Sequence, residues 1–352
     1  MLDLSSNHIV VLEPHSLQEL VNVTELNLSN NSLTELHSRA LSGLVNLQTL
    51  TLSHNRLRHL SNDALKSLSK LRKLDLSRNL ISVISTGAFS TQSSLLHLDL
   101  GSNVISSLSE YSLMGLNSIQ HLNMSNNIVH KVSSLYIRSL TTLEVIDLSW
   151  NSITAIGTSS FDGLTSLRCL ILSHQQTLRD IHLNAFSGLN SLSELDLSSC
   201  RSLSSIHRKA FESSTQLRSL DISRCALRSL PPMLLNWNRL TTFELYGNPF
   251  ECNRELLSFL PRLLNKLQIH TASCSSPDEL RDRDIASLVS YSIYSVNSLE
   301  HLMMRESCPM QAHFFSIAAK LPHSKSHHIF ITHSVQFHFM IALITTIISI
   351  PC

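Results

Sequence analysis

An asparagine recurs every 24 residues through the first part of the chain, and this spacing restricts the fold more than any other feature. The period is constant across the seven positions Asn7, Asn31, Asn55, Asn79, Asn103, Asn127 and Asn151. Each asparagine from Asn31 onwards closes a nine-residue segment that has aliphatic residues at its first, fourth and sixth positions, as in Leu71 to Asn79. A fixed period of this length is typical of a stacked repeat, in which each repeat contacts only its neighbours. We therefore expect one elongated repeat domain.

The alternating leucines of each segment predict a short β-strand. Leu74 and Leu76 would lie on one face of such a strand, and Lys73 and Asp75 on the other. A single strand cannot bury its leucines, whereas parallel strands stacked about 4.8 Å apart can. The asparagine amide both donates and accepts hydrogen bonds. A column of asparagines can therefore satisfy the backbone groups at each turn and bridge neighbouring repeats.

The asparagine column changes chemistry after Asn151. Gln175, Cys200 and Cys225 take the next three places, with one-residue insertions between them. A thiol donates weakly to the same turn carbonyls, so we expect Cys200 and Cys225 to be buried free thiols, with a disulfide between adjacent rungs as the alternative. The predicted structural ladder comprises Asn31, Asn55, Asn79, Asn103, Asn127, Asn151, Cys200, Cys225 and Asn248.

The full 24-residue pattern, L-x-x-L-x-L-x-x-N-x-L-x-x-L-x-x-x-x-F-x-x-L-x-x, resembles the typical class of extracellular leucine-rich repeats. That class occurs in adhesion proteins, Toll-type and guidance receptors, and secreted binding proteins. The resemblance covers Leu2 to Asn248. It implies an α/β leucine-rich-repeat solenoid, a curved horseshoe with a concave parallel β-sheet, built over residues 1–248 from about 11 units of which the first is truncated. It also implies a binding rather than a catalytic role.

Residues 249–295 resemble the cysteine-containing cap that follows such repeats. The family pattern has two nearby cysteines and two later ones, paired first to third and second to fourth. Here Arg254 replaces the second cysteine, and no cysteine stands near Tyr294, where the fourth is expected. The resemblance therefore implies a single disulfide, Cys252–Cys274. A zinc site is the competing interpretation, but the spacing lacks C-x-x-C and paired histidines.

The pattern ends near Val296, and we expect an irregular, poorly ordered tail over residues 296–352. The tail is rich in histidine without metal-ligand spacing, and it ends in an apolar run over residues 340–350 that is too short to span a bilayer. A lipid-anchor signal and an unrelated or mispredicted segment are the two interpretations. No signal peptide or amino-terminal cap precedes Leu2. We therefore expect a fragment or incomplete gene model of an extracellular or cell-surface protein.

The composition and motifs argue against catalysis. The sequence holds no G-x-S-x-G, H-E-x-x-H, phosphate-binding glycine loop or kinase signature. The formal charge of +1 and the pI near 7.8 give no broad attraction for nucleic acid. We expect no enzyme activity, no cofactor, no metal site and no nucleic-acid partner, and the short apolar tail leaves membrane association open.

The predicted concave face carries the candidate binding residues. Its central column contains seven acidic residues among eleven, which favours a basic protein or peptide as the partner. The opposing interpretation is that leucine-aspartate-leucine-serine is the ordinary strand of the family. Two histidines on adjacent rungs beside an aspartate predict pH-dependent binding, and an aromatic residue in a nearby turn is a candidate hot spot. The candidate residues are Lys73, Asp75, His97, Asp99, His121, Asn123, Asp147 and Trp150.

Four N-x-S/T motifs are candidate glycosylation sites if the chain is exported: Asn22, Asn27, Asn30 and Asn123. The sequence thus predicts a protein-binding ectodomain or secreted binding protein that acts in recognition, adhesion or signalling. The alternative is a structural matrix or assembly scaffold that associates through its lateral faces.

Overall fold

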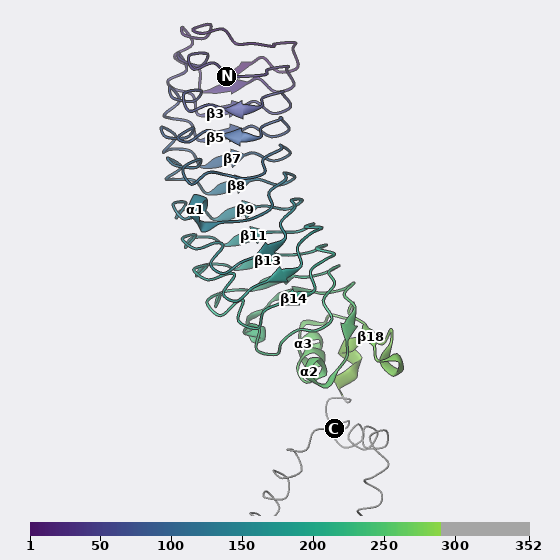
Figure 1. Ribbon diagram of the computed structural model, residues 1–352. Helices are drawn as coiled ribbons and strands as arrows, with labels where there is room; N and C mark the ends of the chain where they lie inside the picture. The colour runs from purple at the N-terminus through teal and green to yellow at the C-terminus, as the bar shows by residue number, and fades with distance from the viewer. Residues whose placement is uncertain (290–352) are drawn as a thin grey trace, which may run out of the picture. The chain divides into compact units, whose positions relative to one another are not determined.

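The computed structural model describes residues 1–289, and its main element is an 11-stranded parallel sheet (Figure 1). Each strand is two or three residues long, and every strand after β1 buries its central aliphatic or aromatic side chain. The strands, in sheet order, are β1 (Leu2–Asp3), β2 (Glu25–Asn27), β3 (Thr49–Thr51), β5 (Lys73–Asp75), β7 (His97–Asp99), β8 (His121–Asn123), β9 (Val145–Asp147), β11 (Cys169–Ile171), β13 (Glu194–Asp196), β15 (Ser219–Asp221) and β16 (Thr242–Glu244). The predicted parallel-sheet solenoid is confirmed.

The strands pair without a shift in register, so residues one period apart lie side by side. Leu74 of β5 is aligned with Leu98 of β7, which is aligned with Leu122 of β8. The outward residues follow the same rule, and Lys73 is aligned with His97, which is aligned with His121. A column of residues in the sequence is therefore a column on the surface of the sheet.

The core lies between this sheet and an outer wall of turns. Leu100, Ile153 and Phe161 are completely buried there. Phe186 stacks between Phe161 and Phe211, with ring centroids 6.2 and 4.8 Å away. Each fully buried side chain of this size contributes roughly 1.5–3 kcal/mol. No single turn encloses its own core, so the stability of one turn depends on the turns beside it.

The outer wall contains only short elements. Two small parallel sheets are formed by β4 (His59–Leu60) with β6 (Val83–Ile84), and by β10 (Ala155–Ile156), β12 (Asp180–Ile181) and β14 (Ser205–Ile206). The one α-helix in the described wall, α1 (Ser134–Ile137), begins at Ser133, whose hydroxyl accepts the backbone N–H of Leu135. The rest of the wall is built from turns, so the sheet is the only extended regular surface of the stack.

The predicted ladder joins successive turns through side-chain hydrogen bonds. In Asn55, Nδ2 donates to the carbonyls of Leu28 and Leu52 at 2.9 and 3.1 Å, and Oδ1 accepts the N–H of Leu33 at 2.9 Å. Each bond that crosses to the preceding turn satisfies a buried backbone group, which would otherwise cost free energy. The ladder residues with this two-way pattern are Asn31, Asn55, Asn79, Asn103, Asn127, Asn151 and Asn248.

The three non-asparagine rungs use the same carbonyls. Gln175 keeps both functions, since its Nε2 donates to Leu148 and its Oε1 accepts from Ile153. Cys200 and Cys225 are buried free thiols. Their Sγ atoms donate to the carbonyls of Leu172 and Leu197 at 3.3 and 3.2 Å. A thiol therefore replaces the donor half of asparagine at these two rungs.

The residue before each ladder position adopts a left-handed backbone conformation. The φ angle is +54° at Trp150 and +56° at His54. Glycine and asparagine tolerate this region well, whereas β-branched residues do not, and no valine, isoleucine or threonine occurs in the column. Its members are Ser6, Asn30, His54, Arg78, Ser102, Asn126, Trp150, His174, Ser199, Arg224 and Gly247.

A cap follows the last strand of the sheet. The backbone pairs β17 (Phe250–Glu251) with β18 (Cys274–Ser276), and between them lie α2 (Arg254–Leu257) and α3 (Leu260–Leu267). Pro261 lies in the first turn of α3, as expected for a residue that starts a helix. Two 3₁₀ helices, η2 (Asp278–Leu280) and η3 (Ile285–Val289), complete the described part of the cap, and η3 packs on α3.

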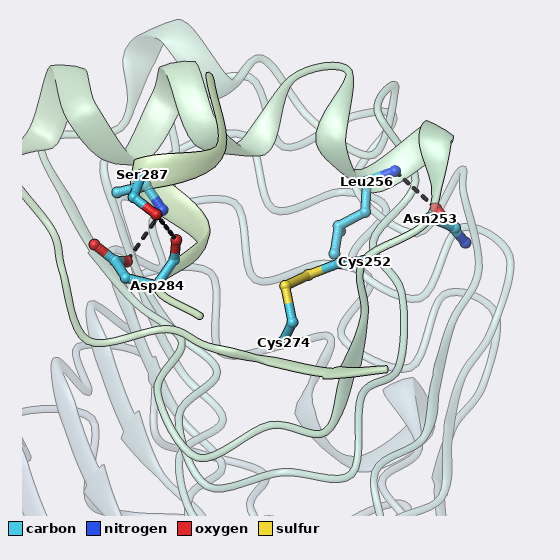
Figure 2. The surroundings of a disulfide bond; sticks show 7 residues. Cys252, Asn253, Leu256, Cys274, Asp284 and Ser287 are labelled. Carbon is cyan, nitrogen blue, oxygen red and sulfur yellow. Dashed lines mark hydrogen bonds between the residues drawn. A yellow bond between two sulfur atoms is a disulfide. The ribbon is translucent and has the colours of Figure 1, made fainter. Parts of the chain in front are cut away.

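The cap contains a disulfide between Cys252 and Cys274, two residues buried in its interior (Figure 2). Beside it, Asn253 begins α2, and its side chain accepts the N–H of Leu256 at 2.9 Å. The cap also contacts the stack through Trp237 of η1 (Trp237–Arg239). The ring of Trp237 lies 5.5 Å from that of Phe243 in β16 and 5.3 Å from that of Phe259 in the cap. An aromatic cluster therefore joins the last repeat to the cap.

The expectations for the histidine-rich tail and its apolar run lie outside the described residues. Within residues 1–289, no helix combines the length and the apolar character that a membrane span requires.

Candidate functional site

The outward side chains of the 11-stranded sheet form a surface with one dominant charge, which we call the sheet face. Its strands carry nine acidic residues and a single lysine, Lys73. The acidic residues are Asp3, Glu25, Asp75, Asp99, Asp147, Glu194, Asp196, Asp221 and Glu244. Because parallel pairing brings these side chains into columns, their charges act together on any molecule that approaches the sheet.

The aspartate column also has a structural function. The Oδ1 of Asp75 accepts the backbone N–H of Ser77 at 2.9 Å, and Asp147 accepts that of Ser149 at 2.8 Å. Asn123 makes the same bond to Ser125. Each bond holds the turn that follows the strand, so the backbone favours an aspartate or asparagine at this position, although Thr51, Ile171 and Glu244 also occupy it. One oxygen of each aspartate is therefore used to hold a backbone turn, and the negative charge of the carboxylates remains available to a partner.

The sheet face has an open hollow of about 300 Å³ over β5, β7 and β8. Leu74 and Leu98 contribute to its lining from the strand centres. Its polar lining consists of five of the eight residues that the sequence indicated, namely Lys73, His97, Asp99, His121 and Asn123. The structure therefore brings most of the candidate residues into one site.

Gly101 lies beside two lining residues of this hollow, Asp99 and Asn123, and the sequence analysis did not single it out. The corresponding position is serine in the neighbouring turns, as at Ser77 and Ser125. A Cβ atom at Gly101 would lie 2.9 Å from Nδ2 of Asn123 and 3.1 Å from Oδ1 of Asp99. The missing side chain therefore leaves room for Asn123 beside Asp99. The replacement of serine by glycine at this repeat position could have been recognised in the sequence.

His97 and His121 line the hollow as a stacked pair. Their ring centroids are 4.6 Å apart and the rings are inclined by 22°. Burial lowers the pKa of His97 below its ordinary value, and repulsion from His121 and Lys73 lowers it further. His97 therefore carries less positive charge at neutral pH than an ordinary histidine, and it offsets less of the negative charge of the neighbouring column.

Asp99 lies at the centre of the acidic column, and its pKa is raised. Burial is the main cause, and repulsion comes from the carboxylates of Asp75 on the adjacent strand and of Asp147 two strands away. Hydrogen bonds from Gly101 and Asn123 oppose the shift. Ionised Asp99 is thus held in an unfavourable field of like charge, and a cationic group placed over the column would relieve that field.

The remaining three candidates lie outside the hollow. Asp75 is aligned with Asp99, and Asp147 with Asn123, so both belong to the same acidic column. Trp150 lies in the turn after β9 and is 54% exposed. Its ring stacks on His174, one period later, with centroids 3.9 Å apart and an 8° angle between the rings. The sequence analysis missed His174, although the 24-residue offset between the two aromatic rings was a readable signal.

The other singled-out side chains on or near the sheet face have no catalytic arrangement. Cys169 is a free thiol in β11 whose pKa is raised to about 11 by burial and then by Glu194. A thiol with a raised pKa is a poor nucleophile. Among the sequon asparagines, Asn22 and Asn30 are exposed. Asn27 and Asn123 are half-buried on the sheet face, where each accepts a backbone N–H.

Comparison with protein families gives one match. A model described as leucine rich repeat matches residues 1–57, 21–81, 46–91, 69–129 and 141–201, which together include more than half of the chain. No curated protein sequence matches the chain significantly.

Chains of three solved complexes have the same fold. A chain from the octameric complex of Latrophilin 3, Unc5D and FLRT2, in which FLRT2 is present as its LRR domain, has a TM-score of 0.68 and 24% identity, covering 81% of this chain and 87% of that chain. A chain of the Toll–Spatzle complex of Drosophila has a TM-score of 0.61 and 21% identity, covering 74% of this chain and 34% of that chain. A chain of the TLR13–ssRNA13 complex has a TM-score of 0.52 and 24% identity, covering 75% of this chain and 44% of that chain. This chain thus spans less than half of the Toll and TLR13 chains.

Proposed function

Because the chain belongs to the leucine-rich-repeat family, we propose that it is a binding module whose sheet face holds a basic segment of another protein. The observation that carries the proposal is the concentration of nine carboxylates against one lysine on a single extended surface. Opposite charge on a partner would be steered to this surface and oriented by it.

The hollow over β5, β7 and β8 provides the anchoring point in this proposal. It offers a carboxylate at Asp99, an amide at Asn123 and the faces of two histidine rings within one depression. A lysine or arginine side chain of the partner would meet a negative field there and could pack along the rings. The partner's positive charge would also reduce the repulsion that raises the pKa of Asp99.

We further propose that the protein acts outside the cell or at its surface, in recognition, adhesion or signalling, without catalysis. The buried Cys252–Cys274 disulfide supports an oxidising compartment. The proposal also includes the division of the chain into repeats over residues 1–248 and a cap over residues 249–295. Two of the three structural neighbours are in complexes with proteins and one is with single-stranded RNA, so RNA serves as the competing ligand in the test.

The test compares the full chain with the triple variant Asp75→Asn, Asp99→Asn, Asp147→Asn. Asparagine already occupies this column at Asn27 and Asn123 with the same backbone bond, so the variant keeps the turns intact. A labelled ten-residue lysine peptide is the probe, measured at physiological salt. We expect at least a tenfold loss of affinity in the triple variant. The control Asp162→Asn, an exposed aspartate on the outer wall, should bind as the unaltered chain does.

Three results would contradict the proposal. Equal affinity of the triple variant would exclude the sheet face as the site. Stronger binding of a single-stranded RNA oligonucleotide than of the lysine peptide would favour nucleic acid. Self-association that survives charge reversal at Asp75, Asp99 and Asp147, measured by analytical ultracentrifugation, would favour the structural scaffold.

A further inference from the structure

A second surface, separate from the sheet face, has the chemistry of a docking site. We call it the ladder flank and define it as the chain that leaves the sheet at each turn. It consists of residues 54–59, 78–83, 102–107, 126–131, 150–155, 174–180 and 199–205. We infer that the ladder flank binds an extended protein segment that is acidic at both ends and apolar in its middle.

Three exposed aliphatic side chains carry the first part of this inference. Leu80, Val104 and Ile128 directly follow the ladder asparagines of three successive turns, and they are 45%, 40% and 44% exposed. Their backbone N–H groups donate to the preceding turns at 2.9, 3.0 and 3.1 Å, so the three residues are stacked in register. A contiguous exposed apolar stripe of this kind is typical of a binding surface.

The fold does not require apolar residues at this position. The same column is occupied by Arg56 one turn before the stripe, and by Ser152, Gln176 and Arg201 in the turns after it. Arg56, Gln176 and Arg201 are exposed, and Ser152 is half-buried. The position therefore faces solvent. One column therefore runs from arginine through three aliphatic residues and two uncharged polar residues to a second arginine.

The charges of the ladder flank are opposite to those of the sheet face. Its segments contain six lysine and arginine residues and one acidic residue, Asp180. All six cations are exposed, and within the described residues none of them forms an ion pair. They are Arg56, Arg58, Arg78, Lys131, Arg179 and Arg201. A partner for this surface is therefore acidic, whereas the partner of the sheet face is basic.

The distribution of charge favours a protein segment over a uniform polyanion. Residues 102–107 and 150–155 contain no charged side chain, and the segment between them, 126–131, carries only Lys131. A sulfated polysaccharide or a nucleic acid carries negative charge along its whole length, and its charges opposite 102–107 and 150–155 would have no cation to pair with. A peptide with apolar side chains at its centre would instead bury them on the stripe. The six steps between the seven turns from Arg56 to Arg201 span roughly 29 Å at about 4.8 Å per step, which matches about nine extended residues.

Trp150 extends the apolar area of the flank and provides a reporter for it. It lies in the turn after Ile128, more than half exposed, with its ring fixed against His174. The chain has two tryptophans, and the other, Trp237, is buried against the cap. A change in tryptophan emission on binding therefore reports on the ladder flank.

The experiment uses the full chain and synthetic nine-residue peptides with three acidic residues at each end. One peptide has leucine-valine-leucine at its centre and the other has three serines. We expect the apolar-centred peptide to bind with a blue shift of Trp150 emission, and the serine-centred peptide to bind at least tenfold more weakly. The stripe variant Leu80→Ser, Val104→Ser, Ile128→Ser and the charge variant Arg56→Ser, Arg58→Ser, Arg201→Ser should each weaken binding at least tenfold.

The sheet-face variant Asp75→Asn, Asp99→Asn, Asp147→Asn is the matched control, and it should bind the acidic peptide as the unaltered chain does. This control separates the inference from the proposed function, because either surface can fail alone. Equal binding of the two peptides would overturn the inference, as would saturable binding of neither. Binding of a heparin oligosaccharide that is weakened by the charge variant but not by the stripe variant would also overturn the inference, because the flank would then bind a polyanion. Unchanged thermal midpoints of the variants would establish that they fold.

Discussion

The Oδ1 atom of Asn103 accepts the backbone N–H of Ile81, a residue of the preceding turn, over 2.9 Å. The Nδ2 atom of the same side chain donates to the carbonyls of Leu76 and Leu100, both at 3.0 Å. One buried amide thus satisfies backbone groups of two turns at once, and this bond pattern repeats along the ladder.

Replacement of Asn103 by alanine should lower the free energy of unfolding by about 3 kcal/mol or more, because several buried backbone groups lose their partner. Asn103→Cys should lose less, since the thiols of Cys200 and Cys225 still donate to the equivalent carbonyls. Urea unfolding followed by circular dichroism measures both. An alanine variant that unfolds at the same urea concentration as the unaltered chain would contradict the prediction.

Leu100→Ala should destabilise the protein by about 2–5 kcal/mol, because the side chain is completely buried between the sheet and the outer wall. Leu80→Ala is the control, since Leu80 is 45% exposed and its truncation leaves no internal cavity. The two variants are compared in the same urea titration. Similar losses at both positions would mean that burial at Leu100 does not determine the effect.

Removal of the cap disulfide by Cys252→Ser with Cys274→Ser should lower stability by about 3 kcal/mol, because the bridge closes a loop across a sequence separation of 22 residues. Mass mapping of the exported, non-reduced chain should recover the two cysteines in one linked peptide. Recovery of both as free thiols would contradict the pairing.

Asp99→Asn should raise the thermal midpoint at pH 7. The folded-state pKa of Asp99 is raised, so the folded protein holds the proton more tightly than the unfolded chain, and ionisation at neutral pH costs stability. The variant removes that cost and can keep the bond to Gly101, as Asn123 does with Ser125. The gain should disappear as the pH falls below about 4, where the unfolded aspartate is also protonated. A lower midpoint at pH 7 would contradict the sign.

Affinity of the sheet face for a basic peptide should fall on acidification. Protonation of His97, whose pKa lies below its ordinary value, adds a positive charge beside the column, and Asp99 with its raised pKa begins to lose its negative charge. Both changes act in the same direction below about pH 6. Titration of the lysine peptide from pH 8 to pH 4.5 measures the fall. His97→Gln should make the decline shallower, and an identical profile would exclude His97.

Much of the architecture followed from the period alone, because parallel pairing without a register shift turns each repeated position into a column. The ladder at Asn55 and the core position at Leu100 could therefore be assigned before any coordinates. The hollow could not, since its lining depends on how the rings of His97 and His121 stack and on how Asn123 fits beside Asp99, where Gly101 has no side chain. The structural role of the aspartate column could not be predicted either. The sequence does not show whether Asp75 is present for its negative charge or for the hydrogen bond that it accepts from the backbone N–H of Ser77.

The left-handed residue before each ladder position keeps one backbone conformation while its side chain varies, from serine at Ser102 to tryptophan at Trp150 and arginine at Arg224. Substitution there changes the side chains along one edge of the sheet and leaves the ladder hydrogen bonds and the core unchanged. Related chains can therefore acquire new binding preferences at this row while their scaffold stays the same, provided that β-branched residues are avoided.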